Sequence, residues 1–222
     1  MTWLPPGLPP ESIIWAILSP VIYGFICLKA NRATFFPVLI AAFVVGFLTS
    51  YVAYVVEASL SGAGFQIHEK HAWLGFMAFV AIPEEAVKLA ALIGLTHSQR
   101  SASRITLIVA CFIGCGFAAS ENLIYLARFG GDVISIRFFT ATAFHVFNAI
   151  IMARLLVTTS IRDEALRIVC ALILPVLLHG TYDYLIGHAT TDGGRFVFVL
   201  GFAVAAGFTT LRTYPAKCQD AA

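Results

Sequence analysis

The stretch Ala72–Leu95 reads AWLGFMAFVAIPEEAVKLAALIGL, which is long enough and apolar enough to cross a bilayer as a helix. Three charged side chains, Glu84, Glu85 and Lys88, nevertheless lie near its middle. A charged side chain at the centre of a membrane helix costs about 2.5–3.5 kcal/mol on insertion scales. These groups must therefore face other protein groups or water. The stretch predicts a membrane protein built from several helices around a polar interior.

The composition of the whole chain supports this prediction. The chain has 222 residues, of which 59% are hydrophobic and only 12% are charged, whereas ordinary soluble domains have about 25% charged residues. A net charge of +2 without a basic stripe gives no reason to expect a nucleic-acid partner. Five cysteines, an odd number, imply no disulfide framework. We expect membrane lipid as a partner, and a multi-pass protein of the cell membrane.

Hydrophobic segments of the length of a membrane span recur along the chain and are joined by short connections. They predict an all-α bundle of about seven transmembrane helices, forming one domain over residues 1–222 with a core at about 72–187. The expected spans are Ser12–Leu28, Phe35–Val56, Ala72–Leu95, Ile105–Ala127, Phe138–Thr158, Ile168–Ile186 and Phe196–Thr210.

The connections differ in their content of Lys and Arg, which sets the expected orientation. One side of the predicted bundle carries nine such residues and the other carries four, among them Arg128 and Arg137. Because basic residues favour the cytoplasmic side, we expect the N-terminus outside and the C-terminus in the cytoplasm. In that orientation the polar residues within the spans share the middle-to-outer half of the bilayer.

Three further spans carry polar side chains at similar depth. Glu121 lies in the fourth span, His145 and Asn148 lie in the fifth, and His179 and Asp183 lie in the sixth. The spacings of three and four residues place each pair on one helix face. We therefore expect these groups to meet Glu84, Glu85 and Lys88 around one hydrated pocket.

Partners within this cluster remain open at the level of sequence. Lys88 is four residues from Glu84 and three from Glu85, so it can reach either carboxylate. Glu121 is an alternative partner for Lys88, and Tyr125, one turn further on, could donate to Glu121. Pro83 is expected to kink the third span or to start a new helical segment within it.

The order of these motifs resembles the PrsW family of intramembrane proteases, which is related to the CAAX-protease and bacteriocin-processing group. The resemblance covers about Pro83 to Asp183 and implies a glutamic-type membrane endopeptidase. In bacteria the founding member begins cleavage of a membrane-bound anti-sigma factor from the extracytoplasmic side, so a single-pass membrane protein is the implied substrate. The matching elements are Glu84-Glu85-x-x-Lys88, Gly116-Phe117 to Glu121-Asn122-x-x-Tyr125, Phe144-His145 and His179-x-x-x-Asp183.

Three positions depart from the CAAX branch of that group. That branch usually has arginine after its paired glutamates and asparagine in its last motif, where this chain has Lys88 and Asp183. It also places phenylalanine four residues before its first histidine, where this chain has Ala141. These differences argue against prenylated CAAX substrates.

Four residues are expected to be catalytic in peptide hydrolysis. Glu84 and His145 would hold a water molecule and remove its proton. Glu85 would position that water or return the proton. His179 would stabilise the oxyanion, a task in which one donor is typically worth about 10²–10³-fold in rate.

Four others are expected to support them. Asp183 would orient His179, and Asn148 could donate to the oxyanion as well. Lys88, together with Glu121, would balance the excess negative charge.

Three alternatives use the same residues or the same composition. We expect no cofactor, but a zinc ion at Glu84, His145 and His179 is an alternative, because two histidines and a carboxylate suit a catalytic zinc site. An ion-coupled or proton-coupled transporter also needs titratable groups at the bilayer midplane. A membrane scaffold has no evident need for so many of them.

Overall fold

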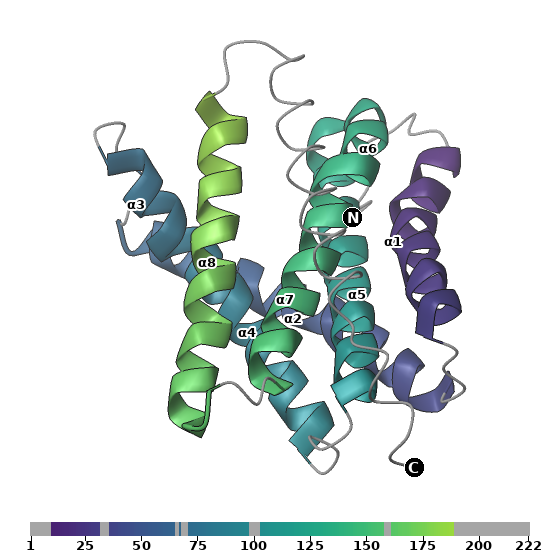
Figure 1. Cartoon of the computed structure of the whole chain (residues 1–222). Helices are drawn as coiled ribbons and strands as arrows, with labels where there is room; N and C mark the ends of the chain where they lie inside the picture. Colours follow the sequence, from purple (N-terminus) through teal and green to yellow (C-terminus); the bar gives the residue numbers. More distant parts are fainter. Residues whose placement is uncertain are drawn as a thin grey trace.

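The computed structural model describes residues 10–31, 36–64, 67, 71–97, 103–157 and 161–188, and its regular elements there are all helices (Figure 1). The predicted all-α class is therefore confirmed. Two of the elements, η2 and η4, are π-helical turns within longer helices. The elements are α1 Pro10–Asn31, α2 Phe36–Gly62, α3 Ala72–Phe76, η2 Met77–Ala81, α4 Ile82–Thr96, α5 Ser103–Phe129, α6 Asp132–Arg137, η4 Phe138–Thr142, α7 Ala143–Val157 and α8 Glu164–His188.

Five helices within the described residues are long and apolar enough to cross a membrane. They correspond to the first, second, fourth, fifth and sixth expected spans. The third expected span is helical as α3, η2 and α4, but it carries three charged side chains and is not among the five. The seventh, Phe196–Thr210, lies outside the described residues. The count of seven and the orientation of the termini remain predictions.

The helix α5 is the centre of the bundle, with α1, α2 and α7 packed around it. Of its apolar window, 72% is buried, whereas only 28% is buried for α1, α2 and α8. These outer helices expose large aliphatic and aromatic side chains, including Phe25, Ile40 and Ile173. Such surfaces suit contact with lipid.

Glycine allows α2 and α5 to approach closely at two points. A Cβ at Gly116 would overlap the backbone of Phe43, and a Cβ at Gly46 would overlap the backbone of Ile113. Small residues at helix contacts are a common means of close packing in membranes. This contact holds α5, which carries Glu121, against α2.

Both π turns lie directly before site residues. The segment η2 ends two residues before Pro83, which occupies the second position of α4 and is followed by Glu84. Proline has no N–H to donate to the preceding turn, and the wider π turn keeps the helix continuous there. Pro83 thus lies in the first turn of the α-helical segment that follows the π turn, in a helix that continues without a break from α3 to α4. The segment η4 ends just before α7 and His145.

The close packing of α2 on α5 predicts that Gly116→Ala lowers stability by about 1–3 kcal/mol, because the new methyl group overlaps backbone atoms that cannot move aside easily. The midpoint of unfolding in detergent, followed by circular dichroism, measures this. Gly94→Ala is the matched control, since nothing lies within 4 Å of its added Cβ. Equal midpoints for the two variants would contradict the packing described.

Candidate functional site

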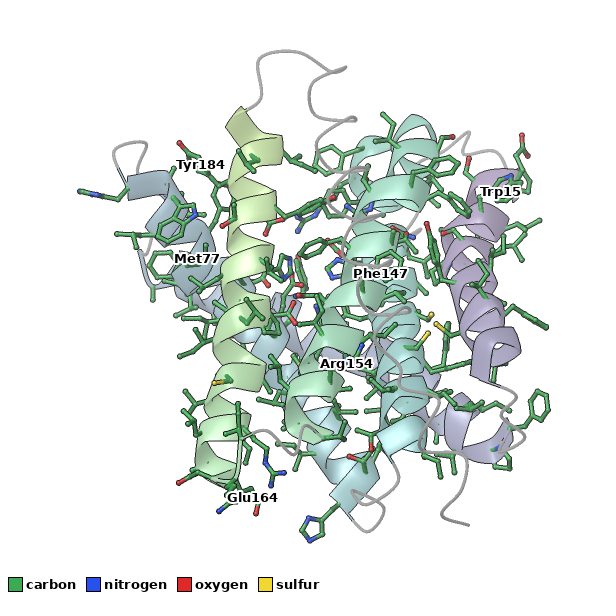
Figure 2. All side chains as sticks on the ribbon, in the orientation of Figure 1. Trp15, Met77, Phe147, Arg154, Glu164 and Tyr184 are labelled. Carbon is green, nitrogen blue, oxygen red and sulfur yellow. The ribbon has the colours of Figure 1, made fainter. Side chains whose placement is uncertain are left out.

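Polar side chains from α4, α5, α7 and α8 meet inside the bundle. Nitrogen and oxygen atoms gather there between α7 and α8 (Figure 2). The groups are buried: Glu85 and Lys88 are 0% exposed, His145 and His179 are 2% exposed, and Glu84 is 6% exposed. The expected convergence of these side chains is therefore present in the structure, whereas the hydrated pocket around them remains a prediction.

Glu85 connects two helices through one oxygen. Lys88 Nζ donates to Glu85 Oε1 at 2.8 Å, and His179 Nδ1 lies 2.7 Å from the same oxygen. Charge-assisted hydrogen bonds of this length are the strong ones in proteins. Glu85 therefore ties α4 to α8 and fixes one side of the His179 ring.

Glu84 is more open than Glu85 with respect to protein partners. Its Oε2 lies 3.7 Å from both Lys88 Nζ and His179 Nε2, which is too long for a hydrogen bond. Within the described part of the chain this oxygen has no hydrogen-bond partner. Glu85 Oε2 likewise has no hydrogen-bond partner there. The two glutamates differ in that Glu85 Oε1 accepts from Lys88 and contacts His179, whereas Glu84 approaches both groups only to 3.7 Å.

His145 has a partner at each ring nitrogen. Lys88 Nζ lies 3.1 Å from Nδ1, and Glu121 Oε2 contacts Nε2. An ammonium group can only donate, so Nδ1 accepts and the ring proton lies on Nε2, facing the carboxylate. This pair of contacts fixes the tautomer and the orientation of the imidazole.

Glu121 pairs with an arginine that the sequence analysis placed in a connection. Arg137 Nη2 lies 3.0 Å from Glu121 Oε2, and Arg137 is only 9% exposed. The close partners of Glu121 in the described residues are thus Arg137 and His145, whereas those of Lys88 are Glu85 and His145. The ring of Tyr125 packs on the guanidinium of Arg137 at 3.7 Å.

Asp183 and Asn148 support the site from α8 and α7. Asp183 Oδ2 lies 3.5 Å from His179 Nε2, so the expected pairing across one helical turn is present. Asn148 Nδ2 donates to the carbonyl oxygen of Pro175 at 3.1 Å, one turn before His179. One amide hydrogen of Asn148 is therefore used to hold α8 against α7.

A fifth carboxylate, which was not predicted from the sequence, belongs to the surroundings of this cluster. Glu57 on α2 is half-buried and lies within electrostatic range of Glu121, His179 and Asp183. The expected second span ended at Val56, whereas α2 continues to Gly62. A predicted second span that continued beyond Val56 would have included Glu57.

Aromatic rings enclose the two histidines. The rings of His145 and His179 are 5.2 Å apart and nearly perpendicular. Phe117 packs on His145 at 5.1 Å and also lies 3.9 Å from Lys88 Nζ, while Phe144 packs on His179 at 5.5 Å. These contacts restrict rotation of the imidazoles.

The cluster also contains a set of metal-binding groups. Glu84, His145 and His179 each offer one ligand atom, and these atoms lie within 4.8 Å of one another. Two histidines and a carboxylate form a common donor set for zinc in hydrolases.

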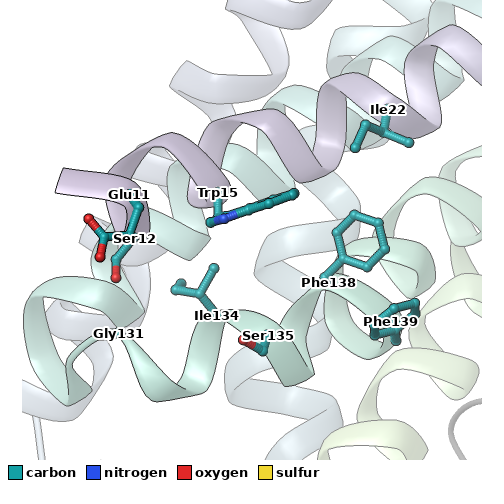
Figure 3. Close-up of a pocket in the computed structure, with 9 residues that line it drawn as sticks. All are labelled: Glu11, Ser12, Trp15, Ile22, Gly131, Ile134, Ser135, Phe138 and Phe139. Atoms are coloured by element: carbon teal, nitrogen blue, oxygen red, sulfur yellow. The ribbon is translucent and has the colours of Figure 1, made fainter. Parts of the chain in front are cut away.

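A separate pocket of about 530 Å³ lies between α1 and the segment α6–η4 (Figure 3). Its walls are mostly apolar and include Trp15, Ile22, Ile134 and Phe138. It contains none of the residues expected to act in catalysis.

A family model described as PrsW family intramembrane metalloprotease matches residues 35–210, which include the whole cluster. The chain belongs to this family. No curated protein and no solved structure matches it. Membership in this family makes the chain a hydrolase of the protease class. The family and the five candidate spans together make it a multi-pass integral membrane protein. They favour proteolysis over the transporter and scaffold alternatives.

The pairing of Lys88 with Glu85 predicts a stability effect that depends on charge. Lys88→Met leaves the buried Glu85 without its cation, and breaking a buried pair in this way costs about 3–5 kcal/mol. The double variant Glu85→Gln/Lys88→Met removes both charges and should unfold at a higher denaturant concentration than Lys88→Met alone. A double variant no more stable than the single one would contradict the charge balance inferred here.

Proposed function

We propose that this protein hydrolyses a peptide bond of a single-pass membrane protein inside the bilayer, as a glutamic-type endopeptidase. The observation that carries the proposal is the carboxylate of Glu84, which lies beside two histidines and approaches Lys88 and His179 only to 3.7 Å, so that its Oε2 has no hydrogen-bond partner. By resemblance, an anti-sigma factor is a candidate substrate. The proposal includes one transmembrane domain of seven helices with its N-terminus outside, which would place the site toward the extracytoplasmic face.

Glu84 acts as the general base in this proposal. Its free Oε2 takes a proton from water as the water oxygen bonds to the carbonyl carbon of the substrate. The same carboxyl then gives the proton to the amide nitrogen as the carbon–nitrogen bond breaks. Glu85 takes no proton in this scheme, because its Oε1 already accepts from Lys88 and contacts His179.

His179 supplies the charge that stabilises the oxyanion. Its Nδ1 is anchored on Glu85, and its Nε2 lies beside Glu84 and Asp183 at 3.7 and 3.5 Å. A proton on Nε2 can be donated to the negative oxygen that forms next to Glu84. Fixed donors of this kind stabilise the transition state without having to reorganise.

His145 has a different role from the one expected from the sequence. We expected it to remove a proton from water together with Glu84, but both of its nitrogens already have partners, Lys88 and Glu121. We propose that His145 holds Lys88 in place beside the glutamates. Proton transfer from water then falls to Glu84 alone.

The metal-dependent form of the same activity is favoured by the family description and by the donor set. Glu84, His145 and His179 would hold the ion, which would polarise the substrate carbonyl and acidify a bound water. The donor types fit, and Glu85 and Glu121 supply the carboxylates that usually contact metal-bound histidines. An ion bound at His145 would have to displace either Lys88 or Glu121.

The base assignment predicts that Glu84→Gln lowers kcat about 10²–10⁴-fold, the usual contribution of general base catalysis. Purified protein in lipid vesicles, supplied with a pool of single-pass transmembrane peptides, provides the assay, with products identified by mass spectrometry. Glu164→Gln at the start of α8 is the matched control and should leave the rate unchanged. Full activity in Glu84→Gln would remove the mechanism.

Chelation separates the two forms of the activity. We expect cleavage to survive dialysis against a strong chelator, with less than one metal ion per chain detected by mass spectrometry of the elements. Activity that disappears on chelation and returns with zinc would instead support the metal-dependent form. In that case the variant His145→Ala/His179→Ala should lose the bound zinc while remaining folded.

A further inference from the structure

We propose that Arg137 is a positioning residue for the hydrolytic site, acting through Glu121 on His145. This inference rests on the proposed function, since it names a residue that holds the site in its working geometry. Arg137 touches none of the groups expected to contact the substrate. Its effect must therefore pass through the carboxylate of Glu121.

The guanidinium of Arg137 is fixed by three residues of α5. Its Nη2 lies 3.0 Å from Glu121 Oε2, its Nε donates to Asn122 Oδ1 at 2.8 Å, and its carbon lies 3.7 Å from the ring centre of Tyr125. Contacts at both the edge and the face of the guanidinium leave the Arg137 side chain little rotational freedom. Its N–H donors are therefore already oriented before any substrate binds.

Asn122, the acceptor of Arg137, is itself held by neighbouring elements. Its Nδ2 lies 3.2 Å from the carbonyl oxygen of Ala16 on α1 and 3.1 Å from Thr142 Oγ1 on η4. Asn122 is 0% exposed. The position of Arg137 thus depends on α1, α5 and η4 together.

Glu121 transmits this position to the site. Its Oε2 contacts both Arg137 Nη2 and His145 Nε2. Without the guanidinium, the partly buried carboxylate of Glu121 would lose one of its two close partners among the described residues and would be free to rotate away from His145. This rotation releases Nε2 of His145, and with it the contact between His145 and Lys88.

The π turn η4 explains how Arg137 and His145 reach the same carboxylate. They are eight residues apart, and in a regular α-helix that spacing would turn their side chains about 80° away from each other. A π turn adds one residue to a turn, so here eight residues cover about two turns. Both side chains then face α5.

The first experiment compares Arg137→Gln and Arg137→Lys in the vesicle cleavage assay, with rates expressed per folded molecule. Residues that orient metal-bound histidines are typically worth about 10–100-fold in activity, and we expect a fall in kcat of the same order for Arg137→Gln, with KM within about twofold. Arg137→Lys keeps the charge and should recover part of the rate. Unchanged kcat in folded Arg137→Gln would overturn the proposal.

Arg128→Gln is the matched control, because Arg128 also pairs with a tyrosine but lies away from the site. Its Nη2 donates to the hydroxyl of Tyr54 at 3.1 Å, and its guanidinium lies 5.2 Å from that ring. We expect wild-type kcat from this variant. Equal losses in the Arg128 and Arg137 variants would assign both effects to stability and overturn the positioning role.

A double-mutant cycle tests the route through Glu121. If Arg137 acts only through that carboxylate, then Arg137→Gln/Glu121→Gln should be no slower than Glu121→Gln. Losses that add fully would overturn this route.

Nuclear magnetic resonance of protein labelled with ¹⁵N-histidine separates this inference from the proposed function, because it needs no cleavage. In wild type the His145 signals should show the proton on Nε2, and in Arg137→Gln they should show a changed tautomer population. Unchanged His145 signals would overturn the positioning role even if the protein cleaves peptides. Absence of cleavage together with changed signals would instead remove the proposed function and keep the role of Arg137 in holding His145.

Discussion

Within the described residues, several carboxylates are buried or half-buried beside two permanent cations, Lys88 and Arg137, and this is the constraint on which the structure depends. Lys88 lies against Glu85, and Arg137 lies against Glu121, so each cation serves one carboxylate at close range. The two ion pairs are joined by His145, which contacts both Lys88 and Glu121. Burying any of these charges without its partner would cost several kcal/mol, comparable with much of a domain's stability. The relative positions of α4, α5, α6 and α7 are thus tied to a single network of charge.

Features set by local spacing could be predicted from the sequence. Hydrophobic length located the described helices to within a few residues at most of their ends, because a bilayer demands about 20 apolar residues regardless of context. The pair His179–Asp183 also followed from helical geometry, since residues three or four apart share a face, whereas the same rule left Lys88 free to pair with either Glu84 or Glu85. The convergence of four helices on one cluster followed from the cost of leaving charges in lipid. Each of these inferences considered a single helix, or applied to every helix the same energetic cost of placing a charge in lipid.

Contacts between helices could not be predicted in the same way. The pairing of Glu121 with Arg137 depends on how α5 and α6 rotate about their axes, which the average hydrophobicity of a span does not specify. Arg137 had the sequence context of a span boundary, because a basic residue followed by aromatic residues is typical of an interface. The π turns were invisible for a related reason: each changes the phase of a helix by one residue without changing its composition. Recognising that Glu121 needed a cation other than Lys88 was the one route to Arg137 from sequence.

The unequal surroundings of Glu84 and Glu85 carry the functional interpretation. A buried pair that only fixed the register of helices would need one carboxylate and one ammonium, and Glu85 with Lys88 meets that need. Glu84 adds a second carboxylate beside them. Its Oε2, like that of Glu85, has no hydrogen bond within the described residues, and Glu84 lacks the close contacts that Glu85 makes through Oε1. A buried polar atom in that state lowers stability, so a purely structural site would be better served by an apolar side chain at this position. Under the proposed function, a substrate, a water molecule or a cation between Glu84 and His179 would offset this cost. The proposal therefore links the unsatisfied carboxylate oxygens to binding, and membership in a protease family supports peptide hydrolysis as the chemistry.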